Sequence, residues 1–177
     1  APGRCGGRAG ALGVAVGDFV EVTRADLIER YIGWTARNVR KYVKAAKGSV
    51  LFVDECYSLV DGKEGLYGDE AIAELVAAME NNYDDVVIIF AGYKDKTEEF
   101  IARNPGLRSR INFKMTFEDY NAKELADIAQ KMAKDRGFRL TAEARERVAK
   151  LMQDVLGQKD FGNGRYARNV IDQAIMN

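Results

Sequence analysis

Residues 48–55 (Gly-Ser-Val-Leu-Phe-Val-Asp-Glu) contain a short apolar run that ends in two adjacent carboxylates, Asp54 and Glu55. A run of this length with β-branched members predicts a strand covered on both faces, and parallel α/β sheets bind ligands beyond the carboxyl ends of such strands. There Asp54 is placed to hold a Mg²⁺ ion, and Glu55 to polarise a water for attack on a γ-phosphate. The octet alone is equally compatible with a core strand followed by acidic loop residues.

Strands and helices are predicted to alternate along the first two thirds of the chain. Apolar runs indicate strands, and spacings of three and four residues indicate helices, with Thr35 capping one of them. The expected strands lie at 19–23, 50–53, 86–91 and 111–117, and the expected helices at 25–30, 35–46, 69–81 and 94–103. This alternation predicts a parallel sheet layered by helices.

From residue 118 the pattern predicts helices only. Asn121 with Glu124 forms a capping signal for one helix, Thr141 caps a second, and a last helix begins near Arg165. We therefore expect three regions, which are an irregular glycine-rich start at 1–17, an α/β core at 18–117 and a small all-α domain at 118–177.

Charge, histidine and cysteine content exclude several classes of function. The chain has 27 basic and 27 acidic residues, so no net field attracts nucleic acid or an anionic membrane. It has no histidine, which removes Ser-His and Cys-His catalysis, and its two cysteines are too few for a disulfide framework. The densest apolar run is too short to cross a bilayer, and we expect a cytoplasmic protein.

Short segments spread along the chain, in order and with consistent spacing, resemble one branch of the AAA+ ATPases. This branch includes the stage V sporulation protein K group and the red-type Rubisco activases. The segments lie at 19–27, 31–33, 50–55, 79–82, 91–93, 104–110 and 162–165. The resemblance implies a core of the P-loop NTPase type followed by a helical lid, with ATP and Mg²⁺ as cofactors.

The resemblance also implies catalytic roles. Asp54 and Glu55 match the Walker B pair, as Mg²⁺ ligand and water activator. Arg110, which ends the turn Asn-Pro-Gly-Leu-Arg-Ser-Arg, matches the arginine finger that one ring subunit supplies to its neighbour. A planar guanidinium suits dispersed phosphate charge. Arg108 is the competing candidate, and a solvated turn arginine is the alternative.

Two further residues match nucleotide sensors. Arg165 follows a glycine turn and matches the sensor-2 arginine with which the lid touches bound nucleotide. Alternatively, it is a surface charge paired with Asp160 or Asp172. Tyr93 follows the second core strand, where many relatives carry Asn or Thr, and its hydroxyl either orients water or has a structural role.

Tyr31, Ile32 and Gly33 match the pore loop of the family, in which an exposed aromatic residue of each ring subunit grips an unfolded substrate. Glycine gives such a loop freedom, and tyrosine offers a wide contact area with few rotors. The competing interpretation is that Tyr31 or Trp34 packs in the core.

The chain departs from the family at the phosphate-binding loop. A P-loop follows the pattern Gly-x-x-x-x-Gly-Lys-Ser/Thr, whose N–H groups and lysine hold the phosphates, and this pattern does not occur here. The first lysine is Lys41, and Arg8 is no equivalent because its bulky fork does not fit the place of the lysine. We expect a truncated ATPase or a degenerate paralogue.

The family also has a strand before the P-loop, lying between the strands expected at 86–91 and 111–117. Without it, two rows of backbone groups are unpaired, each costing about 1–3 kcal/mol when buried. Three compensations are open: residues 9–16 fill the gap, a partner chain fills it, or the remaining strands close up.

The resemblance implies the ATPase module of a ring-forming protein remodeller, either Rubisco-activase-like or sporulation-protein-K-like. Such a module is a homo-oligomer, hexameric in the family, that acts on a protein substrate. As it stands, the chain is expected to be deficient in ATP binding. A second hypothesis is a non-catalytic subunit that offers Arg110 to an intact AAA+ partner. Zero net charge and the aromatic loop disfavour a nucleic-acid-handling clamp loader, and no membrane partner is expected.

Overall fold

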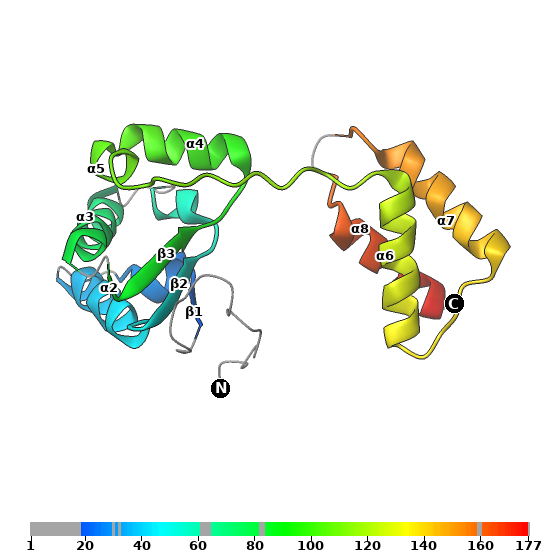
Figure 1. Cartoon of the computed structure of the whole chain (residues 1–177), viewed down its shortest axis with the longest axis horizontal. Helices are drawn as coiled ribbons and strands as arrows, with labels where there is room; N and C mark the ends of the chain where they lie inside the picture. The colour runs from blue at the N-terminus through cyan, green and yellow to red at the C-terminus, as the bar shows by residue number, and fades with distance from the viewer. Residues whose placement is uncertain are drawn as a thin grey trace. The chain divides into compact units, whose positions relative to one another are not determined.

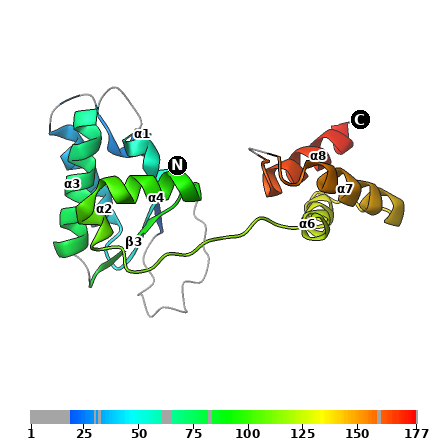
Figure 2. The ribbon, with the colours of Figure 1, turned by 90° about the horizontal axis from the view of Figure 1, so that it is seen from above.

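The structure is a computed structural model that describes residues 19–29, 31, 33–60, 65–81, 84–158 and 161–176. The chain divides into two compact units, one ending at Met115 and the other beginning at Thr116. In their described parts, the first unit holds a parallel sheet with helices and the second holds helices only (Figures 1 and 2). The expected α/β core followed by a helical lid is confirmed.

The sheet has three parallel strands among the described residues. They are ordered β1 (Val20–Val22), β2 (Ser49–Val53) and β3 (Val86–Phe90), with β2 in the centre. Leu51 of β2 lies opposite Val20 on one side and Ile88 on the other. The short strand β1 leads into the brief helix α1 (Arg24–Leu27).

One face of this sheet is buried under helices. Val22, Val53 and Phe90 share the face, and the first two have no exposed surface. The ring centroid of Phe90 lies 6.1 Å from that of Phe100, so β3 packs against the helix that carries Phe100. The same core cluster takes residues from α2 (Trp34–Ala45), α3 (Gly65–Asn81), α4 (Lys94–Arg103) and the short α5 (Pro105–Arg108).

The opposite face of the sheet is apolar, and no helix of the described residues covers it. It carries Val50, Phe52, Val87 and Ile89, and none of these belongs to the buried core cluster or to the apolar residues packed against it. Val87 is 38% exposed and Ile89 is 40% exposed. The expectation that β2 is covered on both faces is therefore wrong for the described residues, because their helices pack on the other side.

The prediction of a strand at 111–117 is also wrong. Residues 111–120 form no helix or strand, and Phe113, Met115 and Phe117 are between 81% and 94% exposed. A strand is stabilised by backbone pairing with a neighbour, and among the described residues β3 pairs only with β2. The remaining strands have not closed up, and residues 9–16 lie outside the described residues.

Helix starts differ from expectation in two places. The prediction that Thr35 caps α2 is wrong, because the helix begins one residue earlier and Gly33 is its N-cap, at a φ of +80° that favours glycine. Thr35 is buried instead, and its hydroxyl accepts a hydrogen bond from the N–H of Glu29 at 3.1 Å. The helix expected at 69–81 begins earlier, at Gly65.

The second unit is built from α6 (Ala122–Asp135), α7 (Ala142–Val155) and α8 (Gly164–Met176). Both capping predictions are confirmed. Asn121 Oδ1 accepts from the N–H of Glu124 at 3.0 Å, the Glu124 carboxylate accepts from the N–H of Asn121 at 2.9 Å, and Thr141 Oγ1 accepts from the N–H of Ala144 at 3.2 Å. The helices share one core, centred on Leu125, Ala129, Met152 and Ile171.

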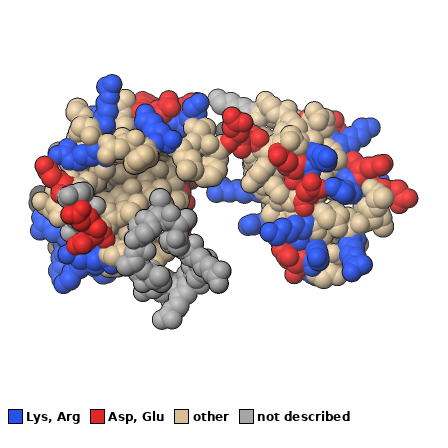
Figure 3. All heavy atoms as spheres, viewed as in Figure 1, with Lys and Arg blue, Asp and Glu red and all other residues tan. Residues whose placement is uncertain are grey.

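Figure 3 shows the charged side chains on one face of the molecule. Acidic and basic side chains are interspersed on the face drawn in Figure 3, in keeping with equal numbers of both. Within the described part of the chain, no helix combines the length and the apolar character needed to span a membrane.

Candidate functional site

The candidate site lies at the carboxyl ends of β2 and β3. Asp54 and Glu55 directly follow β2, and Tyr93 lies three residues beyond β3. The Tyr93 ring is 6.2 Å from the ring of Tyr57, which sits in the short 3₁₀ helix η1 (Cys56–Leu59) after the carboxylates. The sheet thus brings three of the predicted site residues to one edge, as its parallel topology predicts.

Backbone hydrogen bonds hold the carboxylate loop to both neighbouring strands. The N–H of Asp54 donates to the carbonyl of Val22 at 2.9 Å, and the N–H of Cys56 donates to the carbonyl of Ala91 at 3.0 Å. Between them Glu55 has a φ of +48°, which is uncommon for a residue other than glycine. This conformation turns the chain sharply out of β2.

The two carboxylates have different surroundings. Asp54 is half-buried, and its Oδ1 accepts the N–H of Glu55 at 2.9 Å. Glu55 is exposed to solvent. The first carboxylate is therefore oriented by the backbone, whereas the second has access to water.

A pocket of about 550 Å³ opens onto both carboxylates. Mg²⁺ is usually held by one or two protein carboxylates, with water and phosphate as the remaining ligands, and Asp54 and Glu55 fit that donor set. The described residues contain no group of three or more His, Cys, Asp or Glu side chains that would hold a metal alone. The pocket is lined by Thr23, Arg24, Ala25, Ile28, Glu29, Asp54, Glu55 and Ser58.

A second hollow of similar size, about 610 Å³, lies in the helical unit between α6 and α7. None of the predicted site residues lines it. Of the predicted site residues, Asp54 and Glu55 line the pocket beside β2.

Arg24 is a pocket residue that sequence reasoning did not single out. Its Nη1 donates to the carbonyl of Ser58 at 2.5 Å and to that of Leu59 at 3.2 Å, so it ties the start of α1 to η1. Its only sequence signal was its place in the segment 19–27, which resembles the AAA+ branch.

Tyr57 is a second residue that the sequence did not reveal. Burial raises the pKa of its hydroxyl, and the negative charge of Glu55 raises that pKa further, so the phenol stays protonated beside the carboxylate. Lys96 places its Nζ 4.9 Å from the Tyr57 ring centroid and 5.8 Å from that of Tyr93. Tyr93 itself is 62% exposed, so it forms the outer wall of this cluster.

Gly92 allows the two tyrosines to lie so close. A Cβ atom at this position would stand 2.8 Å from both the ring of Tyr57 and the hydroxyl of Thr97. Any other residue would push Tyr57 away from the carboxylate loop, which explains the glycine in the segment 91–93.

Cys56 is fully buried beside the site, and burial raises the pKa of its thiol above the ordinary value of 9.0. Because the thiolate is the reactive form, we expect Cys56 to react slowly with a disulfide reagent at pH 8 in the folded chain and rapidly in denaturant. The rates are measured in a Cys5→Ser background, with Cys56→Ala as the control that removes the slow phase. Equal rates in both solvents would contradict the burial.

The raised pKa of Cys56 also makes the stability of the chain depend on pH. Because folding raises this pKa, the thiol ionises at a lower pH in the unfolded chain than in the folded chain. The contribution of Cys56 to the free energy of unfolding is therefore complete below pH 9.0 and is lost as the pH rises through the folded pKa. We expect the denaturation midpoint of the Cys5→Ser chain to fall in this alkaline window more steeply than that of the Cys5→Ser, Cys56→Ala chain.

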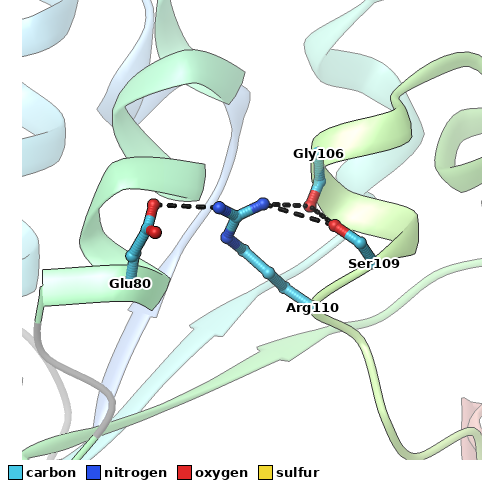
Figure 4. A network of polar contacts seen from close by, with 4 residues as sticks. All are labelled: Glu80, Gly106, Ser109 and Arg110. Carbon is cyan, nitrogen blue, oxygen red and sulfur yellow. Dashed lines mark hydrogen bonds and ion pairs between the residues drawn. The ribbon is translucent and has the colours of Figure 1, made fainter.

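Arg110 is held within its own chain (Figure 4). Its Nη2 donates to the carboxylate of Glu80 at 2.9 Å, and its Nη1 donates to the carbonyl of Gly106 at 3.1 Å and to the hydroxyl of Ser109 at 3.3 Å. The Arg110 side chain is 30% exposed and that of Glu80 is 67% exposed. The corner is therefore at the surface, and none of these partners lines the pocket. Arg108, the competing candidate, is exposed.

Arg165 lies exposed in the first turn of α8, in the second unit. Its N–H donates to the carbonyl of Gly162 at 2.8 Å, which closes the glycine turn. Of the two carboxylates offered as surface partners, Asp160 lies outside the described residues and Asp172 pairs with Arg136.

The aromatic residues at the start of α2, Tyr31 and Trp34, are exposed. Tyr31 is 70% exposed and Trp34 is 52% exposed, and their ring centroids lie 6.2 Å apart. The alternative that either ring packs in the core is therefore wrong. Gly33 stands between them in a left-handed conformation, and Ile32 lies outside the described residues.

Comparisons with known protein families agree with this geometry. The family described as "ATPase family associated with various cellular activities (AAA)" matches residues 8–119, and the AAA lid domain matches residues 121–177. Together the two matches cover both units.

Several curated proteins are similar over most of the chain. Protein CbbX of Cereibacter sphaeroides is 44% identical over 162 residues, which are 91% of this chain and 52% of that protein. The chloroplastic ribulose bisphosphate carboxylase/oxygenase activase of Cyanidioschyzon merolae is 43% identical over 159 residues, 89% of this chain and 54% of that protein. Stage V sporulation protein K of Bacillus subtilis is 39% identical over 162 residues, 90% of this chain and 50% of that protein.

The chain thus spans about half the length of the curated relatives it matches. Among solved structures, the crystal structure of the FIGL-1 AAA domain in complex with ADP superimposes with a TM-score of 0.60 at 20% identity. The match covers 88% of this chain and 50% of that one. At this identity the likeness concerns the fold alone.

Proposed function

Because the chain belongs to the AAA family of ATPases and is similar to CbbX and stage V sporulation protein K over nine-tenths of its length, we propose that it is the ATPase module of a ring-forming, ATP-driven protein remodeller. One observation carries the proposal. A backbone-oriented Asp54 and a solvent-exposed Glu55 share a pocket at the carboxyl end of the central strand.

The residues of the pocket suit distinct tasks in phosphoryl transfer. Asp54, oriented by the Glu55 amide, is the residue to hold a Mg²⁺ ion, which when bound neutralises charge on the nucleotide phosphates. Glu55 has access to water and can orient it and accept its proton. Burial and the charge of Glu55 raise the pKa of Tyr57, so its phenol stays protonated near this carboxylate, and the ring of Tyr93 lies beside that of Tyr57.

The proposal also includes the assembly of subunits into a ring and the substrate on which this ring acts. The exposure of Tyr31 supports a role as the pore-loop aromatic residue. It lies beside Trp34 and close to Gly33, whose lack of a side chain gives the loop conformational freedom. Arg165 supports the role of a lid sensor, because it is exposed at the start of α8 after a glycine turn. The substrate class is an unfolded segment of a protein, and the assembly is a homo-oligomer.

We further propose that the chain, as it stands, binds ATP weakly. The P-loop pattern does not occur in the sequence. Among the described residues that line the pocket there are three carboxylates and one guanidinium, that of Arg24, and this group already donates to two backbone carbonyls. Phosphates entering the pocket would therefore meet net negative charge.

A nucleotide titration tests this point. We expect calorimetry with ATP and Mg²⁺ to show no saturation in the micromolar range and no phosphate release above background, since the sequence has no P-loop pattern and the described residues of the pocket carry more negative than positive charge. An intact CbbX protein is the positive control. Micromolar affinity with Mg²⁺-dependent phosphate release, abolished in Glu55→Gln, would overturn the proposed deficiency and establish the ATPase site.

A second candidate function is a non-catalytic subunit that supplies an arginine finger to an intact AAA+ partner. The observation that favours it is the setting of Arg110, whose guanidinium lies at the surface and is oriented by Glu80, Gly106 and Ser109 rather than by the pocket of its own chain. Such a subunit does not need a phosphate-binding loop of its own. Its test is the stimulation of a partner's hydrolysis.

A further inference from the structure

We propose that two copies of this chain dimerise by exchanging an extended segment, residues 112–118, which pairs with the open edge of β3 in the other copy. The inference concerns strand pairing and does not rest on ATP hydrolysis. Two observations carry it: within the described residues, one edge of the sheet and one strand-like segment of the same chain both lack a pairing partner.

The open edge belongs to β3. The N–H of Ala91 donates to Val53, and the carbonyl of Asp85 accepts from Gly48, so the odd-numbered residues of this strand bond toward β2. Successive residues of a strand point their N–H and C=O groups to opposite sides. The backbone groups of the intervening residues therefore face the open side, where no described strand pairs with them; these residues are Val86, Ile88 and Phe90. An edge of this kind is a template for pairing with another strand.

Apolar side chains accompany this edge. Val87 and Ile89 are 38% and 40% exposed and lie on the open face of the sheet beside Val50 and Phe52. A strand added to β3 would cover part of this surface with its own side chains. The hydrophobic effect would then add to the backbone hydrogen bonds.

The segment 112–118 has the pattern of a half-buried strand. Its sequence, Asn-Phe-Lys-Met-Thr-Phe-Glu, alternates apolar with polar residues over its whole length. The apolar members are nearly fully exposed, with Phe113 at 94%, Met115 at 81% and Phe117 at 86%. Monomeric proteins rarely leave such a row of large side chains in water.

A second copy of the chain is the occupant that uses both features. Among the described residues β3 pairs with β2 alone, and the three apolar side chains of the segment are exposed, so the segment does not pair with β3 of its own copy. When two copies exchange segments, residues 112–118 of each copy pair with the edge of β3 in the other copy. The resulting dimer is closed and has two-fold symmetry. With equal numbers of acidic and basic residues, the chain sets up no net repulsion against its own copy.

The experiment measures mass by light scattering and sedimentation over a range of concentrations. We expect a species of twice the chain mass of 19.7 kDa that dissociates on dilution. The double variant Lys114→Pro, Met115→Pro removes the backbone N–H from two successive residues. One of these two N–H groups faces β3 in the proposed pairing, so its hydrogen bond is lost, and we expect the dissociation constant of the dimer to rise by about tenfold or more. The matched control is Lys114→Ala, Met115→Ala, which removes the same side chains but keeps both donors and should retain most of the dimer.

Three further measurements separate strand pairing from non-specific association and from misfolding. Amide exchange at Val86, Ile88 and Phe90 should slow as the wild-type chain dimerises and should stay fast in the double-proline variant. Leu151→Lys, which removes an exposed apolar residue from α7, should leave the dimer unchanged. Unchanged helical circular dichroism would show that the proline variant folds, because the segment lies outside both cores.

Three results would overturn the proposal. A chain that stays monomeric at every concentration is one, and protected β3 amides in that monomer would show that residues 9–16 of the same copy fill the edge. Association that the prolines leave unchanged is the second. Loss of the dimer in Leu151→Lys is the third, since it would place the contact on the helical unit.

Discussion

Arg110→Ala is expected to abolish the stimulation that this chain gives to ATP hydrolysis by an intact AAA+ relative. An arginine finger contributes about 10³–10⁵-fold in kcat, because its guanidinium meets the charge that develops on the transferred phosphoryl group. The Arg110 guanidinium is oriented by three polar partners within its own chain and is 30% exposed, so it is available at the surface. The measurement is phosphate release by the relative, alone and mixed with each variant.

Three variants sharpen this test. Arg108→Ala removes the competing candidate, and Arg103→Ala removes an exposed arginine that pairs only along α4 with Glu99, so neither should affect the stimulation. Arg110→Lys keeps the charge but loses the planar fork, and we expect it to restore little. The ion pair with Glu80 is exposed and contributes about 1 kcal/mol or less, so the fold should survive. Full stimulation by Arg110→Ala, or its loss in Arg108→Ala, would contradict the assignment.

Leu51→Ala is expected to lower the free energy of unfolding of the first unit by about 2–5 kcal/mol. Leu51 is fully buried in the central strand, between Val20 and Ile88, and its truncation leaves a cavity that rigid neighbours cannot fill. The measurement is urea denaturation followed by the fluorescence of Trp34, the only tryptophan, which lies in this unit.

The matched control is Ile89→Ala on the open face of the same sheet. Ile89 is 40% exposed, so its truncation should cost about 1 kcal/mol or less at a concentration where the chain is monomeric. Equal costs for Leu51→Ala and Ile89→Ala would show that the second face is covered in solution, contrary to the structure.

Local patterns predicted most elements of the fold. The capping residues Asn121 and Thr141 were predictable because their partners stand three residues away in the chain. Thr35 was predicted to cap α2 and does not, since the cap depends on how the preceding loop turns, and Gly33 makes that turn in the left-handed region. The strand expected at 111–117 failed for a different reason: its alternating pattern is present, but pairing requires an adjacent edge.

The candidate site shows the same division. Asp54, Glu55 and Tyr93 were predictable because parallel strands end at one edge of the sheet. Arg24 was not, because its partner Ser58 lies 34 residues away along the chain. Tyr57 was not either, because an aromatic residue beside a buried cysteine is typical of a core, and only the tertiary contacts place its ring beside that of Tyr93.

By itself, the amino-acid sequence determined the order of most strands and helices, the all-α second unit, the pair of carboxylates after the central strand and the absence of a P-loop pattern, because each of these depends on neighbouring residues. Only the tertiary structure decided that helices bury one face of the sheet, that Arg110 is held by Glu80 and that 111–120 lies unpaired. Burial and pairing depend on residues far apart in the chain, so no local pattern determines them.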